Sequence, residues 1–220
     1  LNQASRCRTW RCHPTGGCIN RGGQAQCITA CVNGLLTPMT DFHPPIWLPG
    51  GHVQTLWRKL ASPVAALSRQ RQRIELPDGD FIDVDWMHSS LSGRQPARQP
   101  LVFLLHGLAG SSNSPYILSM QTLLHQQGYS SVAMNLRGCS GEINRLAVAY
   151  HSGCSHDVEA VIDQLLLMMP QGQKLVVIGY SLGANVLLKW LSETRHQNRV
   201  AGGVSVSNPF LLALCCERMN

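Results

Sequence analysis

The sequence predicts an α/β domain with a largely parallel sheet that begins with an antiparallel hairpin. Between residues 101 and 207, short apolar runs typical of buried strands alternate with amphipathic segments typical of helices. Before them, two alternating segments flank the turn pair Asp78-Gly79. Successive strand-helix-strand units give parallel strands with helices on both faces of the sheet.

The hairpin is predicted from the alternation on both sides of its turn. Apolar residues stand at every second position, with Ile74 and Leu76 before the turn and Ile82, Val84 and Trp86 after it. A period of two places them on one face of the strand pair. Residues 87–100 are polar and contain glycine and proline, so we expect a loop there.

The first parallel strand and its helix follow that loop. Leu101–Leu105 is continuously apolar, as expected of a strand buried on both faces. Ser114-Pro115 predicts a capped helix start and Gly128 predicts its end. The residues expected on the buried face of this helix are Tyr116, Met120, Leu123 and Leu124.

The same alternation continues to the end of the sheet. Further strands are predicted at Ser131–Leu136, Leu175–Gly179 and Gly203–Ser207. Ser155 is expected to cap a helix that Pro170 stops, and a second helix is predicted from Leu182 to about Thr194. The first of these helices carries its apolar residues at helical spacing: Val158, Val161, Ile162, Leu165 and Leu166.

Charge and composition exclude several classes of protein. The 220-residue chain has a formal net charge of +6, but residues 1–40 hold four arginines and no acid, which leaves fourteen Lys and Arg against twelve Asp and Glu in residues 41–220. The body is therefore near neutral, and no basic stripe suggests a nucleic-acid partner. No apolar run is long enough to span a bilayer, and the N-terminus lacks the apolar core of a signal peptide, so we expect a cytoplasmic location.

The first 38 residues differ from the rest of the chain. Five of the nine cysteines fall within residues 1–31, and their gaps match no zinc-ligand spacing, so we predict no metal site and no cofactor. The segment shows no strand or helix period, and the first methionine is Met39. We expect residues 1–38 to be a disordered or non-native extension and residues 39–220 to be the folded, partial domain.

The clearest chemical motif is Gly179-Tyr180-Ser181-Leu182-Gly183, which lies between a predicted strand and a predicted helix. In that context a G-x-S-x-G sequence is typical of the nucleophile elbow of an α/β-hydrolase. The serine hydroxyl must be exposed on a strained turn, and glycines at the flanking positions allow the strand and helix to approach closely. Ser181 is therefore the candidate nucleophile.

A second motif, His106-Gly107-Leu108, directly follows the strand Leu101–Leu105. Acyl transfer needs hydrogen-bond donors for the oxygen that becomes negative. In this fold one donor is the amide after the nucleophile, here Leu182, and the other comes from the loop after an earlier strand, here Leu108. We expect His106 to be a buried residue that organises this loop, because it precedes the serine in the chain.

Together these motifs resemble AB hydrolase family 4, the YheT-type members of the AB hydrolase superfamily. The resemblance runs from about Phe42 to Phe210. It rests on several motifs in order: Pro49-Gly50-Gly51-His52-Val53-Gln54-Thr55, Glu75-Leu76-Pro77-Asp78-Gly79-Asp80, His106-Gly107-Leu108 through Ser114-Pro115-Tyr116, Arg137-Gly138-Cys139-Ser140-Gly141-Glu142, Tyr150-His151-Ser152-Gly153 and Gly179-Tyr180-Ser181-Leu182-Gly183.

The resemblance implies a carboxylic ester hydrolase with a Ser-Asp-His triad, acting on short-chain esters or acylglycerols as small-molecule substrates. In this fold the order is serine, acid, histidine. After Ser181 the chain has no aspartate, and its only histidine, His196, would lie roughly 20 Å away along the helix at 1.5 Å per residue. The acid and the histidine base are thus absent, and we expect a truncated sheet and an inactive fragment.

Two questions stay open at this level. The parts identified would also serve a thioesterase, or a non-catalytic binding module that keeps the fold. The segments Arg137–Glu142 and Tyr150–Gly153 follow the carboxyl end of a strand, where α/β sheets build their sites. They either border the substrate pocket or form a loop held by a contact between Arg137 and Glu142.

Overall fold

The computed structural model describes residues 11–12, 18–19, 45–47, 50, 53, 57, 68–89 and 99–219. The chain divides into two compact units, Leu1–Gln54 and Thr55–Asn220. In the first unit β1 (Arg11–Cys12) pairs antiparallel with β2 (Cys18–Ile19), so that Cys12 lies opposite Cys18. Apart from these strands, the predicted extension over residues 1–38 lies outside the described residues.

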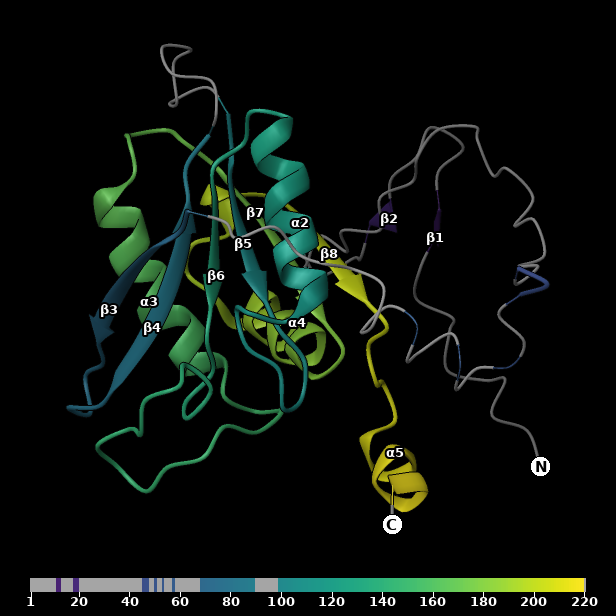
Figure 1. Cartoon of the computed structure of the whole chain (residues 1–220). Helices are drawn as coiled ribbons and strands as arrows, with labels where there is room; N and C mark the ends of the chain where they lie inside the picture. Colours follow the sequence, from purple (N-terminus) through teal and green to yellow (C-terminus); the bar gives the residue numbers. More distant parts are fainter. Residues whose placement is uncertain are drawn as a thin grey trace. The chain divides into compact units, whose positions relative to one another are not determined.

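The second unit contains a six-stranded sheet in the order β3-β4-β6-β5-β7-β8 (Figure 1). Its strands are β3 (Gln70–Glu75), β4 (Phe81–Met87), β5 (Leu101–Leu105), β6 (Ser131–Met134), β7 (Leu175–Tyr180) and β8 (Val200–Val206). The β3–β4 hairpin is antiparallel, and β4 also runs antiparallel to β6. The pairs β5–β6, β5–β7 and β7–β8 are parallel. The predicted parallel sheet with an antiparallel start is confirmed.

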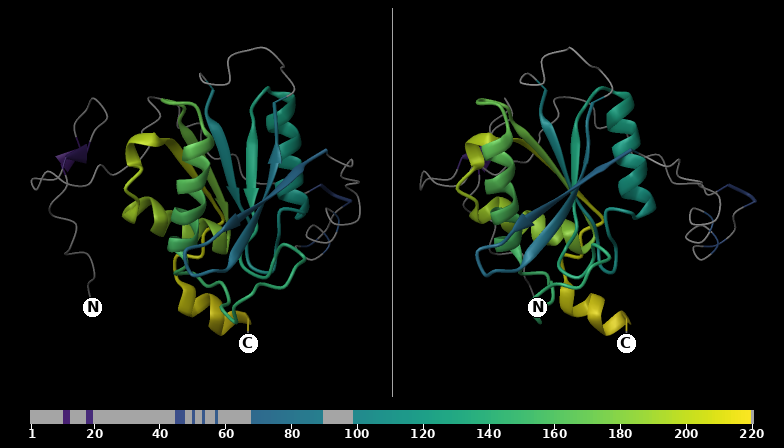
Figure 2. Two further views of the ribbon diagram at one scale, coloured as in Figure 1. Left: turned by 90° about the vertical axis from the view of Figure 1, so that its left-hand side faces the viewer. Right: turned by 60° about the vertical axis from the view of Figure 1, so that its left-hand side comes forward.

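Helices cover both faces of this sheet (Figure 2). Helix α2 (Pro115–Gln126) packs on one face, and α3 (Ser155–Met168) and α4 (Leu182–Glu193) pack side by side on the other. A short 3-10 helix (Gln197–Arg199) precedes β8, and α5 (Leu212–Met219) follows it. Within the described residues, no helix combines the length and apolarity needed to cross a membrane.

The core is divided by the sheet into two layers. Strand β5 is buried along its whole length, and its side chains alternate between the layers. Phe103 and Leu105 join the larger cluster with α3 and α4, whereas Val102 and Leu104 join the smaller cluster under Ile117 of α2. Burying each large apolar side chain contributes about 1.5–3 kcal/mol. The central strands that end at the candidate site are therefore packed into the core on both faces.

Helix α2 buries the predicted face in part. Tyr116, Met120 and Leu124 pack against the smaller cluster as predicted, but Leu123 is 51% exposed and the fully buried residues are Ile117 and Gln121. Gln121 is tolerated in the core because its amide nitrogen donates a hydrogen bond of 3.0 Å to the carbonyl oxygen of Asp85. Ser114 stands at the N-cap position, but its hydroxyl accepts a hydrogen bond from the amide of Ser111 and does not cap the helix.

Other element boundaries also differ from the prediction. Helix α3 is preceded by Cys154 at the N-cap position, and the hydroxyl of Ser155 contacts Glu193 and Lys189 of α4, so Ser155 is not the cap. Strand β8 begins at Val200, three residues before the predicted start, and α5 was not predicted.

Candidate active site

Ser181 occupies the sharp turn between β7 and α4. Its backbone has φ 51° and ψ −120°, a left-handed conformation that costs a residue with a side chain on the order of 1–3 kcal/mol. The turn is held by two backbone bonds, from the Ser181 amide to the carbonyl of Val206 (2.9 Å) and from the amide of Ala184 to the carbonyl of Ser181 (2.9 Å). The side chain of Ser181 is exposed at the carboxyl end of β7.

Two glycines allow this turn to be so tight. A Cβ at Gly179 would lie 2.7 Å from the Cα of Ala184, in the first turn of α4. A Cβ at Gly183 would overlap the carbonyl oxygen of His106 and lie 2.8 Å from that of Leu105. Both close approaches involve backbone, which cannot move aside as a flexible side chain can. Glycine at these positions is therefore a steric requirement of the elbow.

The loop after β5 passes directly beside the serine. A Cβ at Gly107 would lie 3.0 Å from the Cβ of Ser181 and 3.1 Å from the carbonyl oxygen of Tyr180. Ala109, two residues on, has φ 53°, and the amide of Gly110 donates to the carbonyl of Gly107 (3.1 Å). The Leu108 side chain is 58% exposed. The two predicted motifs, far apart in sequence, are thus brought into contact.

Two backbone amides near Ser181, those of Leu182 in α4 and Leu108 in the loop after β5, are available as hydrogen-bond donors. Leu182 is the first residue of α4, so its N–H has no acceptor within the helix. In the part of the chain that the structure describes, the amide of Leu108 has no hydrogen-bond acceptor either. An amide at a helix N-terminus favours negative charge. The surroundings of the serine hydroxyl are therefore suited to an anionic oxygen.

His106 is fully buried beneath this loop. Its Nε2 accepts a hydrogen bond from the amide of Leu136 (3.1 Å), so Nδ1 carries the proton and donates to the carbonyl of Gly107 (2.7 Å). Burial lowers the pKa of the imidazole, and its bond with the Gly107 carbonyl offsets only part of that effect. Both ring nitrogens are occupied, which leaves no lone pair to accept a proton from Ser181.

Arg137 lies at the centre of a buried ion-pair network. It binds Asp157 of α3 through two hydrogen bonds of 2.8 and 2.7 Å and pairs with Asp80 (3.1 Å) and Asp78 (2.7 Å) of the hairpin. Of the two interpretations left open for this segment, the one with a contact between Arg137 and Glu142 is not observed. Arg137 pairs instead with three aspartates, of which Asp80 and Asp157 are buried.

The loop after Arg137 is bound to the β3–β4 hairpin instead. Glu142 pairs with Arg73 (2.7 Å), and Arg71 donates to the carbonyl of Ser140 (2.7 Å). Asn144 donates to Asp80 (2.9 Å). The loop leads to Tyr150, whose hydroxyl accepts a hydrogen bond from the amide of Ala109 (2.8 Å). The segments Arg137–Glu142 and Tyr150–Gly153 thus reach the loop beside Ser181.

Hollows also surround this region. One of about 520 Å³ is lined by Ala109, Gly110, Ser111, Asn113, Ser114, Gly138, Cys139 and Gly141. A second, of about 570 Å³, is lined by residues 137–138, 141–144 and 146–150. Burial raises the pKa of the Cys139 thiol, so it is a poor nucleophile at neutral pH. The hydroxyl of Ser181 remains the best-placed nucleophile at this end of the sheet.

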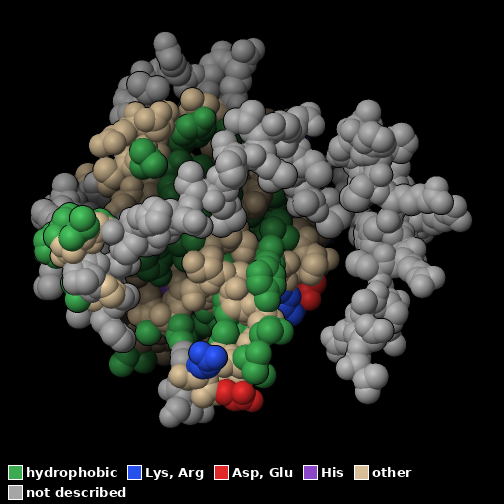
Figure 3. All heavy atoms as spheres, turned by 90° about the vertical axis from the view of Figure 1, so that its right-hand side faces the viewer, with side chains coloured by type: hydrophobic (Ala, Val, Ile, Leu, Met, Phe, Trp, Pro, Cys, Tyr) green, Lys and Arg blue, Asp and Glu red, His purple; other side chains and the backbone are tan. Residues whose placement is uncertain are grey.

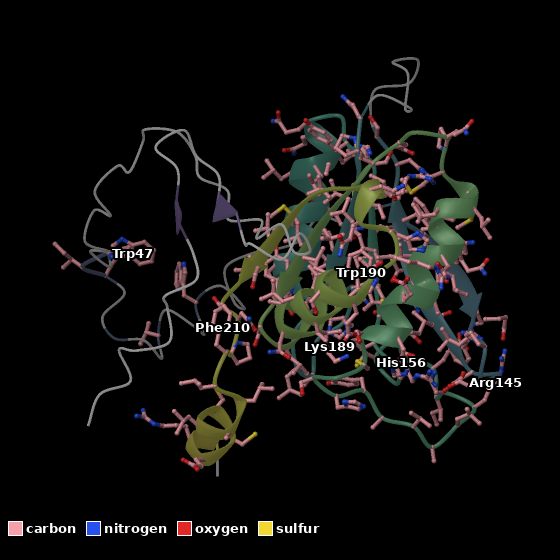
Figure 4. The ribbon with its side chains drawn as sticks, turned by 180° about the vertical axis from the view of Figure 1, so that it is seen from behind. Trp47, Arg145, His156, Lys189, Trp190 and Phe210 are labelled. Carbon is pink, nitrogen blue, oxygen red and sulfur yellow. The ribbon has the colours of Figure 1, made fainter. Side chains whose placement is uncertain are left out.

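His196 lies at the far end of α4 and is engaged elsewhere. Its Nε2 is 2.5 Å from Oδ1 of Asp163, and Glu159 lies nearby at 3.7 Å. These three residues could hold a metal ion, since their ligand atoms lie within 4.8 Å of one another. Arg195, however, pairs with Asp163 (2.5 Å) and with Glu159 (3.7 Å), which already balances the two carboxylates. We interpret the cluster as a group of ion pairs that connects α3 to the residues directly after α4. Figure 4 shows both helices, with His156 labelled on α3 and Lys189 and Trp190 on α4.

A parallel sheet with helices on both faces and a serine at a strand-turn-helix elbow defines an α/β-hydrolase. The family model of the alpha/beta hydrolase fold matches residues 100–217, and the chain belongs to this family. It is also 36% identical over 195 residues to a candidate esterase of Escherichia coli (strain K12), YheT, covering 89% of this chain and 56% of that protein. The resemblance to the YheT-type hydrolases is thereby confirmed.

Other relatives belong to the same broad class. The human phospholipase ABHD3 is 28% identical over 180 residues, covering 81% of this chain and 44% of its own length. A structure of the Pyrococcus furiosus esterase Pf2001 superposes with a TM-score of 0.58 at 21% identity, over 70% of this chain and 54% of that one, and supports the fold. The chain spans about half the length of the curated relatives it matches.

Proposed function

We propose that the protein is a serine carboxylic ester hydrolase in which Ser181 is the nucleophile. The observation that carries this proposal is the strained, exposed Ser181 with Gly107 packed against it. Strain at an exposed serine is retained only where the surrounding structure enforces it, and it clusters at active sites. The fold and the relatives named as esterases, phospholipases and lipases support the ester-hydrolase class.

In the proposed reaction the Oγ of Ser181 attacks the acyl carbon of the ester. The carbonyl oxygen then becomes negative, and the amides of Leu182 and Leu108 donate hydrogen bonds to it. Removal of one such donor typically lowers kcat about a hundredfold to a thousandfold. A base accepts the proton of the Ser181 hydroxyl and returns it to the leaving alcohol, and water then hydrolyses the acyl-enzyme in a second step of the same kind.

Neither His106 nor His196 is placed to act as the base in either step. The two ring nitrogens of His106 are occupied, and His196 is bound to Asp163. In the α/β-hydrolase fold the acid and the histidine of the triad follow the serine in the chain, and after Ser181 residues 182–220 hold no aspartate and one histidine, His196. Without a base, turnover falls about a millionfold in a serine hydrolase, and the oxyanion donors alone leave about a thousandfold to ten-thousandfold over water. We therefore propose that the 220-residue chain by itself is a poor or inactive hydrolase.

The test uses the coding sequence continued past residue 220 and a fluorophosphonate probe. The probe should label Ser181, and Ser181→Ala should abolish labelling. Ser192→Ala, an exposed serine of the same helix whose hydroxyl bonds to the carbonyl of Lys189, should leave labelling intact. Labelling that survives Ser181→Ala would show that the nucleophile lies elsewhere.

A comparison of the two lengths of chain tests the missing base. We expect the continued polypeptide to hydrolyse a short-chain nitrophenyl ester and the 220-residue chain to do so at least a thousandfold more slowly. Equal rates would contradict the proposed catalytic order. A thioesterase would instead show a larger kcat/KM for acyl thioesters, and a non-catalytic binding module would show neither activity nor probe labelling.

A further inference from the structure

Two tyrosine hydroxyls hold the amides on either side of Leu108. The hydroxyl of Tyr116 accepts from the amide of Gly107 (3.0 Å), and the hydroxyl of Tyr150 accepts from the amide of Ala109 (2.8 Å). The amide between them, that of Leu108, keeps no acceptor in the described part of the chain. Of three consecutive donors, only the middle one is left for a ligand.

We infer that Tyr150 is a positioning residue of the oxyanion hole, which acts by fixing the amide of Ala109 so that the amide of Leu108 faces the reacting oxygen. The inference rests on the proposed function of Ser181. It assigns to Tyr150 no contact with substrate, because its hydroxyl is already bound to the loop.

The backbone of the loop explains why such a support is needed. Ala109 has φ 53°, a left-handed conformation that is unfavourable for an L-residue. The hydrogen bond from the Ala109 amide to Tyr150 offsets this cost. Removal of the hydroxyl therefore allows the loop to relax toward an ordinary conformation. Any rotation of this peptide also turns the neighbouring Leu108 amide.

The phenol is suited to this role across the neutral pH range. Burial raises the pKa of Tyr150, and the neighbouring Cys139 raises it as well, against a smaller lowering by the Ala109 amide. The hydroxyl therefore stays protonated. Its oxygen accepts the hydrogen bond from the Ala109 amide.

Tyr150 is itself held at both ends of its loop. Arg73 binds Glu142 and Asn144 binds Asp80 on the hairpin side, as described above. At the other end the amide of Gly153 donates to Nδ1 of His151 (3.0 Å), and α3 begins at Ser155. Tyr116, on α2, binds the Gly107 amide in the loop after β5. Its ring packs against that of Tyr180, with centroids 4.9 Å apart. The two hydroxyls thus reach the loop from different elements of the fold.

The test compares three conservative variants of the polypeptide expressed from the coding sequence continued past residue 220. Tyr150→Phe removes one oxygen and keeps the ring, and we expect kcat for a nitrophenyl ester to fall tenfold to a hundredfold with KM changed less than twofold. Tyr116→Phe removes the other support and should act in the same direction. Tyr129→Phe is the matched control, because Tyr129 lies just before β6 at the opposite end of the sheet, and it should leave kcat unchanged.

A second measurement separates positioning from general destabilisation. A trifluoromethyl ketone forms a tetrahedral adduct whose oxyanion needs the Leu108 amide, so its affinity should fall in parallel with kcat in Tyr150→Phe. The thermal midpoint should stay near that of the parent protein. A folded Tyr150→Phe variant with unchanged kcat and unchanged ketone affinity would overturn the inference. If Tyr150→Phe does not fold, the same result in Tyr116→Phe overturns it.

A failure of the proposed function gives a different result. The parent polypeptide then shows neither ester turnover nor probe labelling of Ser181, and the inference about Tyr150 is rejected with it. Activity in the parent together with unchanged kinetics in both phenylalanine variants rejects the positioning role alone.

Discussion

Gly183, in the first turn of α4, packs against the carbonyl group of His106 at the end of β5, so closely that a methyl group at Gly183 would overlap that oxygen. The nucleophile elbow and the loop beside it are therefore in contact through backbone atoms on both sides. Because neither side is flexible, this one contact links the geometry of Ser181 to that of the loop that carries Leu108.

The first prediction is that Gly183→Ala is strongly disruptive. The added methyl group must displace backbone, and overpacking of a tight site costs about 1–3 kcal/mol or more. We expect a lower thermal midpoint and the loss of probe labelling at Ser181. Gly202→Ala is the control, because a Cβ at Gly202 meets nothing within 4 Å. Equal stability of the two variants would show that the elbow tolerates a side chain at Gly183.

The second prediction concerns the buried charge of Arg137. The residue is 4% exposed, and its partners Asp80 and Asp157 are also buried. Arg137→Met leaves these carboxylates without a counter-charge, which typically costs about 3–5 kcal/mol. Chemical denaturation should show a loss of this size.

Arg195 provides the comparison for that experiment. Its side chain is 68% exposed although it also pairs with Asp163 and Glu159. Exposed pairs of this kind contribute about 0–1 kcal/mol. Arg195→Met should therefore change the free energy of unfolding little, and a loss as large as that of Arg137→Met would contradict the assignment of Arg137 as the structural centre.

The third prediction is a loss of stability on acidification that begins with His106. Burial holds the pKa of His106 below its ordinary value of about 6.5. Below that pH the unfolded chain binds a proton that the folded chain does not, so the free energy of unfolding falls. The drop in thermal midpoint from pH 7.5 to pH 5.5 should be smaller in His106→Gln. An identical drop in both proteins would show that His106 does not contribute.

The carboxylates of β4 extend the loss of stability on acidification to lower pH. Burial raises the pKa of Asp85, but its hydrogen bonds with Arg71 and Ser112 outweigh that effect and the net pKa lies below the ordinary value. Asp83 behaves in the same way through Arg73. These contributions are complete above about pH 4 and are lost as the pH falls through the lowered pKa values of the folded protein. The free energy of unfolding should therefore fall steeply as the pH decreases below about 4.

Much of the sheet could be predicted from the sequence, because burial on both faces leaves a continuous apolar run. Leu101–Leu105 forms β5 with the predicted bounds, and the Asp78-Gly79 turn joins β3 and β4. Apolar spacing predicted Tyr116, Met120 and Leu124 on the buried face of α2, but it could not predict Gln121, which is buried through a hydrogen bond to a strand that is distant in sequence. The start of β8 could not be located because its glycines carry no period.

The two halves of the candidate site were predictable for a different reason. Glycines around Ser181 and Gly107 are required by close approach, and this requirement leaves a local pattern. The supports of the loop left no such pattern. Tyr116 and Tyr150 lie on α2 and on the loop before α3, and their hydroxyls bind amides that lie 9 and 41 residues away in the sequence. The motif around Tyr150 can be recognised in the sequence, but the hydrogen bond between Tyr150 and Ala109 is known only from the structure.

The edge strand β8 has a further consequence for how the chain folds. Its residues are only partly buried, Val204 is 47% exposed, and Phe210 and Leu211 beyond it are 76% and 65% exposed. Hydrophobic side chains are also visible on the face shown in Figure 3, and Phe210 precedes α5 in Figure 4. An apolar edge can pair with the same edge of another molecule. Such pairing is second order whereas folding is first order, so the yield of refolded monomer should decline as the protein concentration rises.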